Sequence, residues 1–205
     1  KGFEQIVYDV LANTQDMNII EKPEPEDTPF YINNGTINVG NTNGKVILQT
    51  FSLESLVRVA EVFQGKVPMC FLLWKGTGAT DLTYDDPLGY ASFINLGVKY
   101  KAHFIGPCIA GAPNDYPELD QPWQDYLIHR AKMKNHPYTF DTYDQMAKYF
   151  GQYNFGVADG MFNPPYLDAL FTNHSDMSIN YMITHGWRKS PASVSYTHLT
   201  LPTIR

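Results

Sequence analysis

The feature that most constrains the fold is the alternation of short β-rich runs with amphipathic helix patterns between residues 45 and 162. The clearest β-rich run is Val67–Trp74, VPMCFLLW, which is apolar almost throughout. A run without a polar face predicts a strand that is covered on both sides, as in parallel sheets. Strands that alternate with helices favour parallel pairing through right-handed crossovers. We therefore expect an α/β protein.

Five strands are predicted, each short. They are Lys45–Thr50, Val67–Trp74, Ala102–Ile105, His136–Phe140 and Val157–Phe162. Helix patterns follow the first four strands, and their starts carry recognisable signals. These signals are Ser52, Pro87, Asp120-Gln121-Pro122 and the capping box Thr142-x-x-Gln145, whose helix extends to Phe150.

A complete eight-stranded β/α barrel takes about 250 residues. Five strand-helix units fit the last five units of an incomplete (β/α)8 TIM-type barrel. No glycine-rich phosphate-binding motif follows any predicted strand, which argues against a nucleotide-binding sheet. Before the first strand, residues 1–13 predict a helix, and residues 14–44 predict a loop excursion with a short strand at Phe30–Ile32.

Both ends of the chain look artificial. The sequence opens inside an amphipathic pattern that includes Phe3 and Ile6, so we expect further residues upstream. The segment Val194–Thr203, VSYTHLTLPT, looks like a translated sequencing adapter. We therefore assign residues 1–193 to one domain and set Val194–Arg205 aside as a non-native tail.

Composition excludes two classes of partner. The net charge is −6, and no block of Lys or Arg forms a phosphate-binding stripe, so we expect no nucleic acid partner. The longest apolar runs have the length of strands, so no transmembrane segment is predicted. Cys70 and Cys108 lie in apolar strand-like segments and are interpreted as buried free thiols, although a disulfide stays open.

In a barrel, functional residues stand at the C-terminal ends of the strands and in the loops that follow. Here these positions are aromatic and polar, with few acids or bases. They are Gln49, Thr50, Phe51, Trp74, Lys75, Gly106, Pro107, Tyr138, Thr139, Phe140, Phe162 and Asn163. Such residues supply walls and hydrogen bonds, but no proton donor or nucleophile. Trp74 fits either packing at the rim or stacking on a substrate.

Three histidines are interpreted as structural. His129 falls in a helix pattern and is predicted at a solvated or rim position of an outer helix. His136 starts a strand at the end remote from the rim, and His103 lies in an apolar strand as a core residue. Asp159 can act through its carboxylate or turn the backbone at the last strand.

Three segments resemble the glycerophosphodiester phosphodiesterases. VILQTFSLESL (Val46–Leu56) is similar to the strand of that family that carries Gln-Ser-Phe. NHPYTFD (Asn135–Asp141) is similar to its penultimate strand, and VADGMFNPPYLDAL (Val157–Leu170) to its last strand. Their order and spacing agree with the family. Asn163-Pro164 departs from the usual Thr-Asp or Thr-Asn.

The resemblance implies a metal-dependent barrel enzyme that hydrolyses glycerophosphodiesters to glycerol 3-phosphate and an alcohol. It implies that Gln49, Phe51, Tyr138 and Thr139 line the substrate pocket; Trp74 joins them by its rim position. It also implies a divalent cation, Ca²⁺ or Mg²⁺, in the full-length parent. The family's His-Arg-Gly, Glu-x-Asp, His-Asp and Glu-x-Lys motifs do not occur here, so we expect the catalytic and metal residues upstream and this chain alone to be inactive.

Two other functions stay open. One is a catalytically inactive barrel that serves as a binding or scaffold domain. The other is a phosphatidylinositol-type phospholipase C. The resemblance also implies a secreted or periplasmic location.

Overall fold

The centre of the protein is a parallel four-stranded sheet. The structure is a computed structural model that describes residues 2–13, 32–33, 36–37, 46–64, 67–74, 84–153 and 167–186. All three strand pairings are parallel, in the order β3-β4-β5-β6. The strands are β3 (Leu48–Thr50), β4 (Met69–Leu73), β5 (Phe104–Pro107) and β6 (Lys134–Asn135). The parallel sheet confirms the α/β class.

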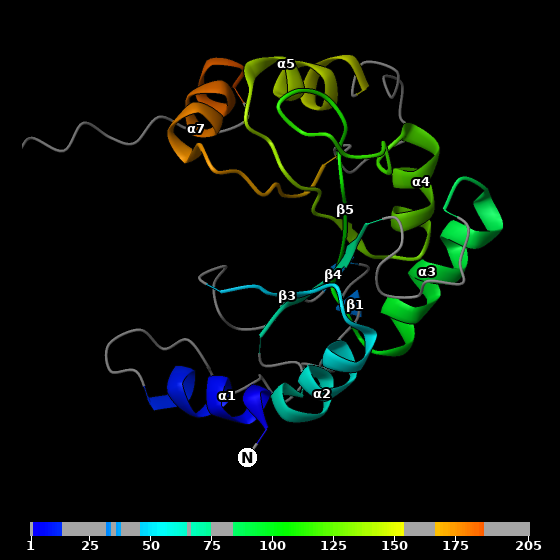
Figure 1. Cartoon of the computed structure of the whole chain (residues 1–205), viewed down its shortest axis with the longest axis vertical. Coiled ribbons are helices and arrows are strands. Elements are labelled where there is room, and N and C mark those ends of the chain that lie inside the picture. The colour runs from blue at the N-terminus through cyan, green and yellow to red at the C-terminus, as the bar shows by residue number, and fades with distance from the viewer. Residues whose placement is uncertain are drawn as a thin grey trace, which may run out of the picture.

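Helices alternate with these strands and follow one another around the sheet (Figure 1). They are α1 (Phe3–Asn13), α2 (Leu53–Phe63), α3 (Pro87–Lys99), α4 (Pro122–Arg130), α5 (Tyr143–Met146) and α7 (Ser175–Thr184). A π-helix, η1 (Ala147–Gln152), continues α5. In the predicted excursion, β1 (Ile32–Asn33) and β2 (Thr36–Ile37) form an antiparallel pair.

The helix starts follow the predicted capping chemistry. Ser52 Oγ accepts a 3.2 Å hydrogen bond from the Ser55 N–H at the start of α2. At α5, Thr142 and Gln145 form a reciprocal capping box. Side chains at these positions satisfy N–H groups that have no partner within the helix, so the sequence sets where each helix begins.

The two faces of the sheet carry different side chains. On the helix-covered face, buried residues such as Phe71 and Ile105 pack against α2, α3 and α4, and the Phe71 and Phe93 rings stack with centroids 4.5 Å apart. The opposite face, here called the inner face, carries Cys70, Leu72 and Phe104. Burial on both faces accounts for the apolar run of β4.

The predicted fourth strand has the wrong boundaries. We expected His136–Phe140, but β6 covers Lys134–Asn135, and only an isolated bridge joins Tyr138 to Cys108 further along. The backbone still follows β5, because the N–H groups of His136 and Tyr138 donate to the carbonyls of Ile105 and Pro107. On β5, Pro107 has no N–H to donate back to the His136 carbonyl, which interrupts the regular pairing there.

Other boundaries differ less. The first predicted strand shrinks to Leu48–Thr50, and the helix expected to end at Phe150 passes into η1 and reaches Gln152. Of the short strand expected at Phe30–Ile32, Ile32 falls in β1, and residues 30 and 31 lie outside the described residues. The predicted fifth strand Val157–Phe162, with Asp159 and Asn163, and the tail after Gly186 lie outside the described residues.

Residues 167–171, here called the strap, lie beside β6. The Ala169 and Phe171 N–H groups donate to the carbonyls of Asn135 and Pro137, at 3.2 and 2.9 Å. Because residue numbers rise in the same direction on both sides, the strap runs parallel to β6. It therefore extends the sheet beyond β6.

Candidate functional site: an aromatic row at the strand ends

Four aromatic side chains from four connections form a continuous row, here called the aromatic row. Phe51 contacts Tyr138 edge-to-face with centroids 5.6 Å apart, Tyr138 lies 6.1 Å from Tyr116, and Tyr116 lies 6.0 Å from Trp74. These residues follow β3, β6, β5 and β4 respectively. The row therefore lies at the C-terminal ends of the strands, where parallel α/β folds place their sites.

Three of the predicted site residues, Phe51, Trp74 and Tyr138, are brought together in this row. Tyr138 is half-buried, and its hydroxyl donates a 3.0 Å hydrogen bond to the Leu73 carbonyl. Burial raises the pKa of Tyr138 strongly, so the hydroxyl stays protonated and serves as a donor. Trp74 and Phe51 remain 43% and 37% exposed.

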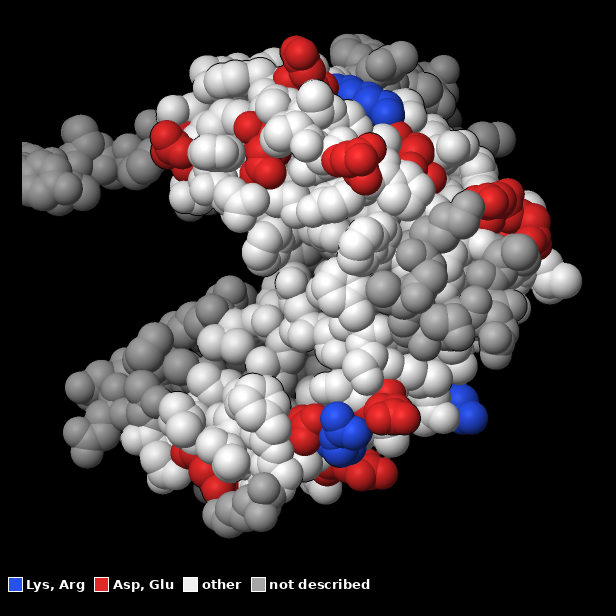
Figure 2. All heavy atoms as spheres, in the orientation of Figure 1, with Lys and Arg blue, Asp and Glu red and all other residues white. Residues whose placement is uncertain are grey.

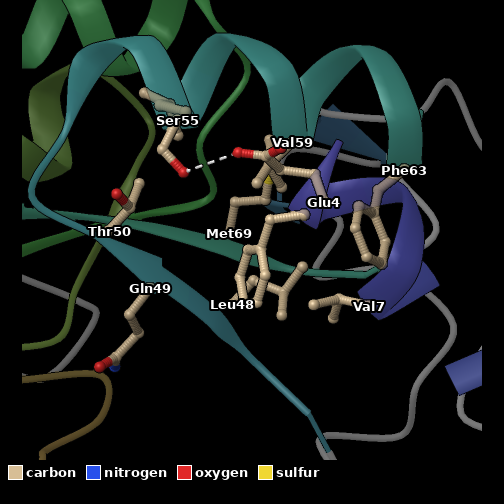
Figure 3. A pocket seen from close by; sticks show the side chains of 11 residues that line it. Glu4, Val7, Leu48, Gln49, Thr50, Ser55, Val59, Phe63 and Met69 are labelled. Carbon is tan, nitrogen blue, oxygen red and sulfur yellow. Dashed lines mark hydrogen bonds between the residues drawn. The ribbon is translucent and has the colours of Figure 1, made fainter. Parts of the chain in front are cut away.

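Gln49 lies next to the row on the inner face. It pairs in register with Cys70, and residues opposite each other in a sheet share a face. Phe51, two residues on, extends from the same side. Figure 3 shows the Gln49 side chain pointing away from the apolar side chains around Leu48 and Met69.

Thr139 is buried rather than free at the rim. Its backbone carbonyl accepts a 2.7 Å hydrogen bond from the Asn114 side chain, which ties it to the loop after β5. Of the five predicted substrate-binding residues, Thr139 is the one whose surroundings are those of a packed position.

Tyr116 was missed by sequence reasoning. It lies in the loop of residues 108–119, whose ends are joined by a 3.1 Å hydrogen bond from the Leu119 N–H to the Cys108 carbonyl. Gln145 holds the loop from α5 by donating to the Gly111 carbonyl at 2.9 Å. The available signal was an aromatic residue in a loop that follows a predicted strand.

The loop is also fixed at Glu118, which accepts hydrogen bonds from Tyr149 and Lys148 of η1. This network orders the loop backbone next to Tyr116. Tyr116 therefore stands on a loop that is held by tertiary hydrogen bonds.

The predicted position of His129 is wrong. We expected a solvated or rim position, but its side chain is only 10% exposed. It lies between two carboxylates, with Nε2 2.8 Å from Asp168 Oδ2 and Nδ1 3.2 Å from Asp125 Oδ2. The helix periodicity was correct, but it could not reveal that α4 turns this face toward the strap.

His103 and the two cysteines lie as predicted, whereas His136 follows the last residue of β6 and does not start a strand. His103 is a core residue whose Nδ1 accepts from the Met69 N–H at 3.1 Å, and burial lowers its pKa to about 4. His136 is buried, with its ring edge-on to Phe104. Cys70 and Cys108 are buried free thiols, and burial raises the pKa of Cys108 to about 12.

The described residues line two cavities that contain no aromatic residue of the row. One, of about 90 Å³, lies between α1, α2 and β3; core side chains such as Val7, Val59 and Phe63 form its wall, and Gln49 lies at its lining (Figure 3). The other, of about 380 Å³, lies between α7 and the strap and is lined mainly by apolar side chains such as Leu167 and Met182. Neither contains a residue of the row.

A metal site is not formed by the residues that the structure describes, among which no three His, Cys, Asp or Glu side chains are grouped to hold an ion. The five predicted site residues likewise include no carboxylate or imidazole. These residues do not fit a divalent cation.

Comparisons leave the family open. No family model matches the chain, and no curated protein matches it significantly. Within the described ranges, no helix combines the length and apolar character that crossing a bilayer requires. The fold and site define an α/β protein with a parallel sheet and an aromatic row at the C-terminal strand ends.

Proposed function

We propose that this chain is the C-terminal part of a β/α-barrel phosphodiesterase that hydrolyses glycerophosphodiesters to glycerol 3-phosphate and an alcohol. The observation that carries the proposal is the contact between Phe51 and Tyr138. The resemblance assigns these residues to one pocket although they lie far apart in the sequence. Their contact at the strand ends is what that assignment requires.

The shape of the described residues also supports a barrel. Figure 2 shows a deep hollow between the part that carries α1 and α2 and the part that carries α5 and α7. Parallel strands with helices on one face and a hollow on the other are expected of a barrel segment. Completion of the barrel by further strands is part of the proposal.

In this proposal the aromatic row is a wall of the substrate pocket. The exposed surfaces of Trp74 and Phe51 pack against the CH groups of the alcohol. Gln49 supplies an amide that can donate to and accept from hydroxyl groups. Tyr138 orients the wall through its bond to Leu73, and Thr139 supports it from behind through Asn114.

Bond cleavage belongs to residues outside this chain. Phosphodiester hydrolysis needs charge stabilisation and an acid and a base. In the family resembled, two histidines and a divalent cation supply them, from motifs that the proposal places N-terminal to Lys1. Because the described residues do not fit that cation, no chemical step is assigned to it here.

A binding or scaffold domain is the second candidate. It is favoured by one observation: the row and the neighbouring Gln49 contain no acid or base. If the upstream strands carry substituted histidines, the same wall would bind a ligand without cleaving it.

The experiment that separates these functions uses a longer protein, in which the reading frame is extended upstream of Lys1 and continues through this chain. It is incubated with glycerophosphocholine or a phosphoinositide, with and without a chelator. Chelator-sensitive release of glycerol 3-phosphate supports the proposal. Cleavage of the phosphoinositide alone indicates a phospholipase C, and binding without cleavage indicates a scaffold.

A further inference from the structure

A buried polar cluster lies between α4 and the sheet, apart from the aromatic row. It consists of Asp120, Asp125, His129, Asn135 and Asp168. Asn135 and Asp120 are fully buried, and Asp125 is 2% exposed. The Asn135 amide donates to both aspartates, at 2.8 Å to Asp120 and 3.0 Å to Asp125. Burying ionisable groups is costly unless they are paired, so this arrangement needs a compensating charge.

His129 supplies that charge. Its two ring nitrogens face Asp168 at 2.8 Å and Asp125 at 3.2 Å. When both carboxylates are ionised, only the imidazolium, which carries a proton on both nitrogens, interacts favourably with both. The contact of Nδ1 with Asp125 is an ion pair without hydrogen-bond geometry. Burial by itself lowers the pKa of His129, but the contacts with Asp125 and Asp168 outweigh it and raise the pKa to about 9.

The charged groups around His129 come from every element packed against it. Asp125 lies on its own helix, Asp120 precedes that helix, Asp168 belongs to the strap, and Lys134 of β6 lies 3.4 Å from Asp168. Burial raises the pKa of Asp120 and Asp125. Burial also acts to raise the pKa of Asp168, but His129 and the Asn135 N–H bring it below the ordinary value. At neutral pH, the His129–Asp168 contact therefore joins a cation to an anion.

Asp168 is also the residue that fixes the start of the strap. Its carboxylate accepts the Asn135 N–H at 2.8 Å, and its own N–H donates to the Asn135 carbonyl at 3.1 Å. The next residue, Ala169, packs against the inner-face cluster of Cys70, Leu72 and Phe104, which Tyr138 also contacts. The strap thus contacts α4 through Asp168 and, through Ala169, the inner-face cluster that Tyr138 also contacts.

We propose that His129 and Asp168 form a proton-dependent latch that holds the strap on β6. The latch is closed while His129 is protonated and Asp168 is ionised. Loss of the His129 proton leaves Asp125 without a cationic partner and Asp168 with Lys134 alone, and the strap separates from β6. The latch holds the strap at the edge of the sheet and uses no residue of the aromatic row. Its test is therefore independent of the proposed phosphodiesterase activity.

The test is an NMR pH titration of the full chain from pH 6 to 10. We expect the His129 imidazole resonances to titrate with a midpoint near 9, about 2.5 units above an ordinary histidine. The Asp168 and Ala169 amide resonances should shift with the same midpoint. The His103 and Cys108 amides, which bond to β4, should not follow it.

Two variants test whether the transition arises from the contact between His129 and Asp168. His129→Gln should remove the transition of the strap amides near pH 9, and Asp168→Asn should move the His129 midpoint downward by more than one unit. The control is His174→Gln, at an exposed position, which should leave the transition unchanged. If either cluster variant fails to fold, the wild-type titration decides alone: a His129 midpoint near 6.5, or strap amides that do not respond at that midpoint, overturns the latch.

Discussion

Tyr138 donates its hydroxyl to the backbone carbonyl of Leu73 across 3.0 Å, and so joins the segment after β6 to the last residue of β4. β5 lies between these two strands in the sheet. The bond therefore spans one strand and holds the Tyr138 ring at the C-terminal ends, in contact with Phe51 and near Tyr116.

Removing this hydroxyl should weaken the protein without dismantling the aromatic row. Tyr138→Phe keeps the ring but loses one hydrogen bond, so we expect the free energy of unfolding to fall by about 1 kcal/mol. Urea denaturation measures it. Tyr143→Phe is the matched control, because Tyr143 is 56% exposed and should change by less than about 0.5 kcal/mol. Equal effects would show that the Tyr138 bond contributes nothing.

The inner face of the sheet has no room for a side chain at Gly106. A Cβ there would lie 2.7 Å from Leu72 Cδ2, 2.8 Å from Cys70 Sγ and 3.0 Å from the His136 carbonyl oxygen. Because one of these neighbours is backbone, Gly106→Ala should destabilise the protein by about 1–3 kcal/mol. At Gly151 the nearest atom would be the Tyr181 hydroxyl at 3.7 Å, so Gly151→Ala should not show this loss. Thermal denaturation of both variants distinguishes the two positions, and a Gly106→Ala melt like that of the wild type contradicts the packing.

A charge added to the buried polar cluster should be poorly tolerated. Asn135→Asp replaces the amide that donates to Asp120 and Asp125 with a third acid. We expect a loss of about 3 kcal/mol or more at pH 7, partly regained at pH 5 as the acids take up protons. Asn180→Asp, at an exposed position on α7, is the control and should change little. Denaturation at the two pH values provides the readout, and a loss that is the same at both would argue against charge repulsion.

The stability of the whole protein should fall between pH 6.5 and 9. The pKa of His129 is raised to about 9 in the folded state, so the folded protein holds a proton that the unfolded chain has released. This contribution is full below pH 6.5 and is lost as the pH rises through 9, with a slope of up to about 1.4 kcal/mol per pH unit. Urea denaturation across this range should show the slope, and His129→Gln should flatten it. An unchanged slope in that variant would assign the effect to other groups.

The sequence predicted the layers better than the contacts between them. Apolar runs and capping residues are local signals, so β4, α2, α3 and the capping box at Thr142 fell where expected. The cluster around His129 depends on Asp168, which is 39 residues away. No local pattern predicts such a partner, and an i, i+4 pair with Asp125 reads equally well as a solvated helix face.

The candidate site likewise combines residues that local signals predict with one that depends on tertiary contacts. Gln49, Phe51, Trp74 and Tyr138 could be chosen because strand ends are predictable from strands. The place of Tyr116 in a loop after a predicted strand was a local signal. Whether its side chain joins the row depends on the shape of the loop of residues 108–119, which is held by tertiary hydrogen bonds to Gln145, Tyr149 and Lys148.

The measurement that tests the central proposal most directly is the release of glycerol 3-phosphate from glycerophosphocholine. The protein assayed is the longer one, in which the reading frame is extended upstream of Lys1 and continues through this chain. We expect release in the presence of Mg²⁺ or Ca²⁺, its loss on chelation, and a raised KM in Trp74→Ala, because Trp74 contributes exposed wall surface. A folded, metal-supplied protein that releases no glycerol 3-phosphate from any glycerophosphodiester would contradict the proposal.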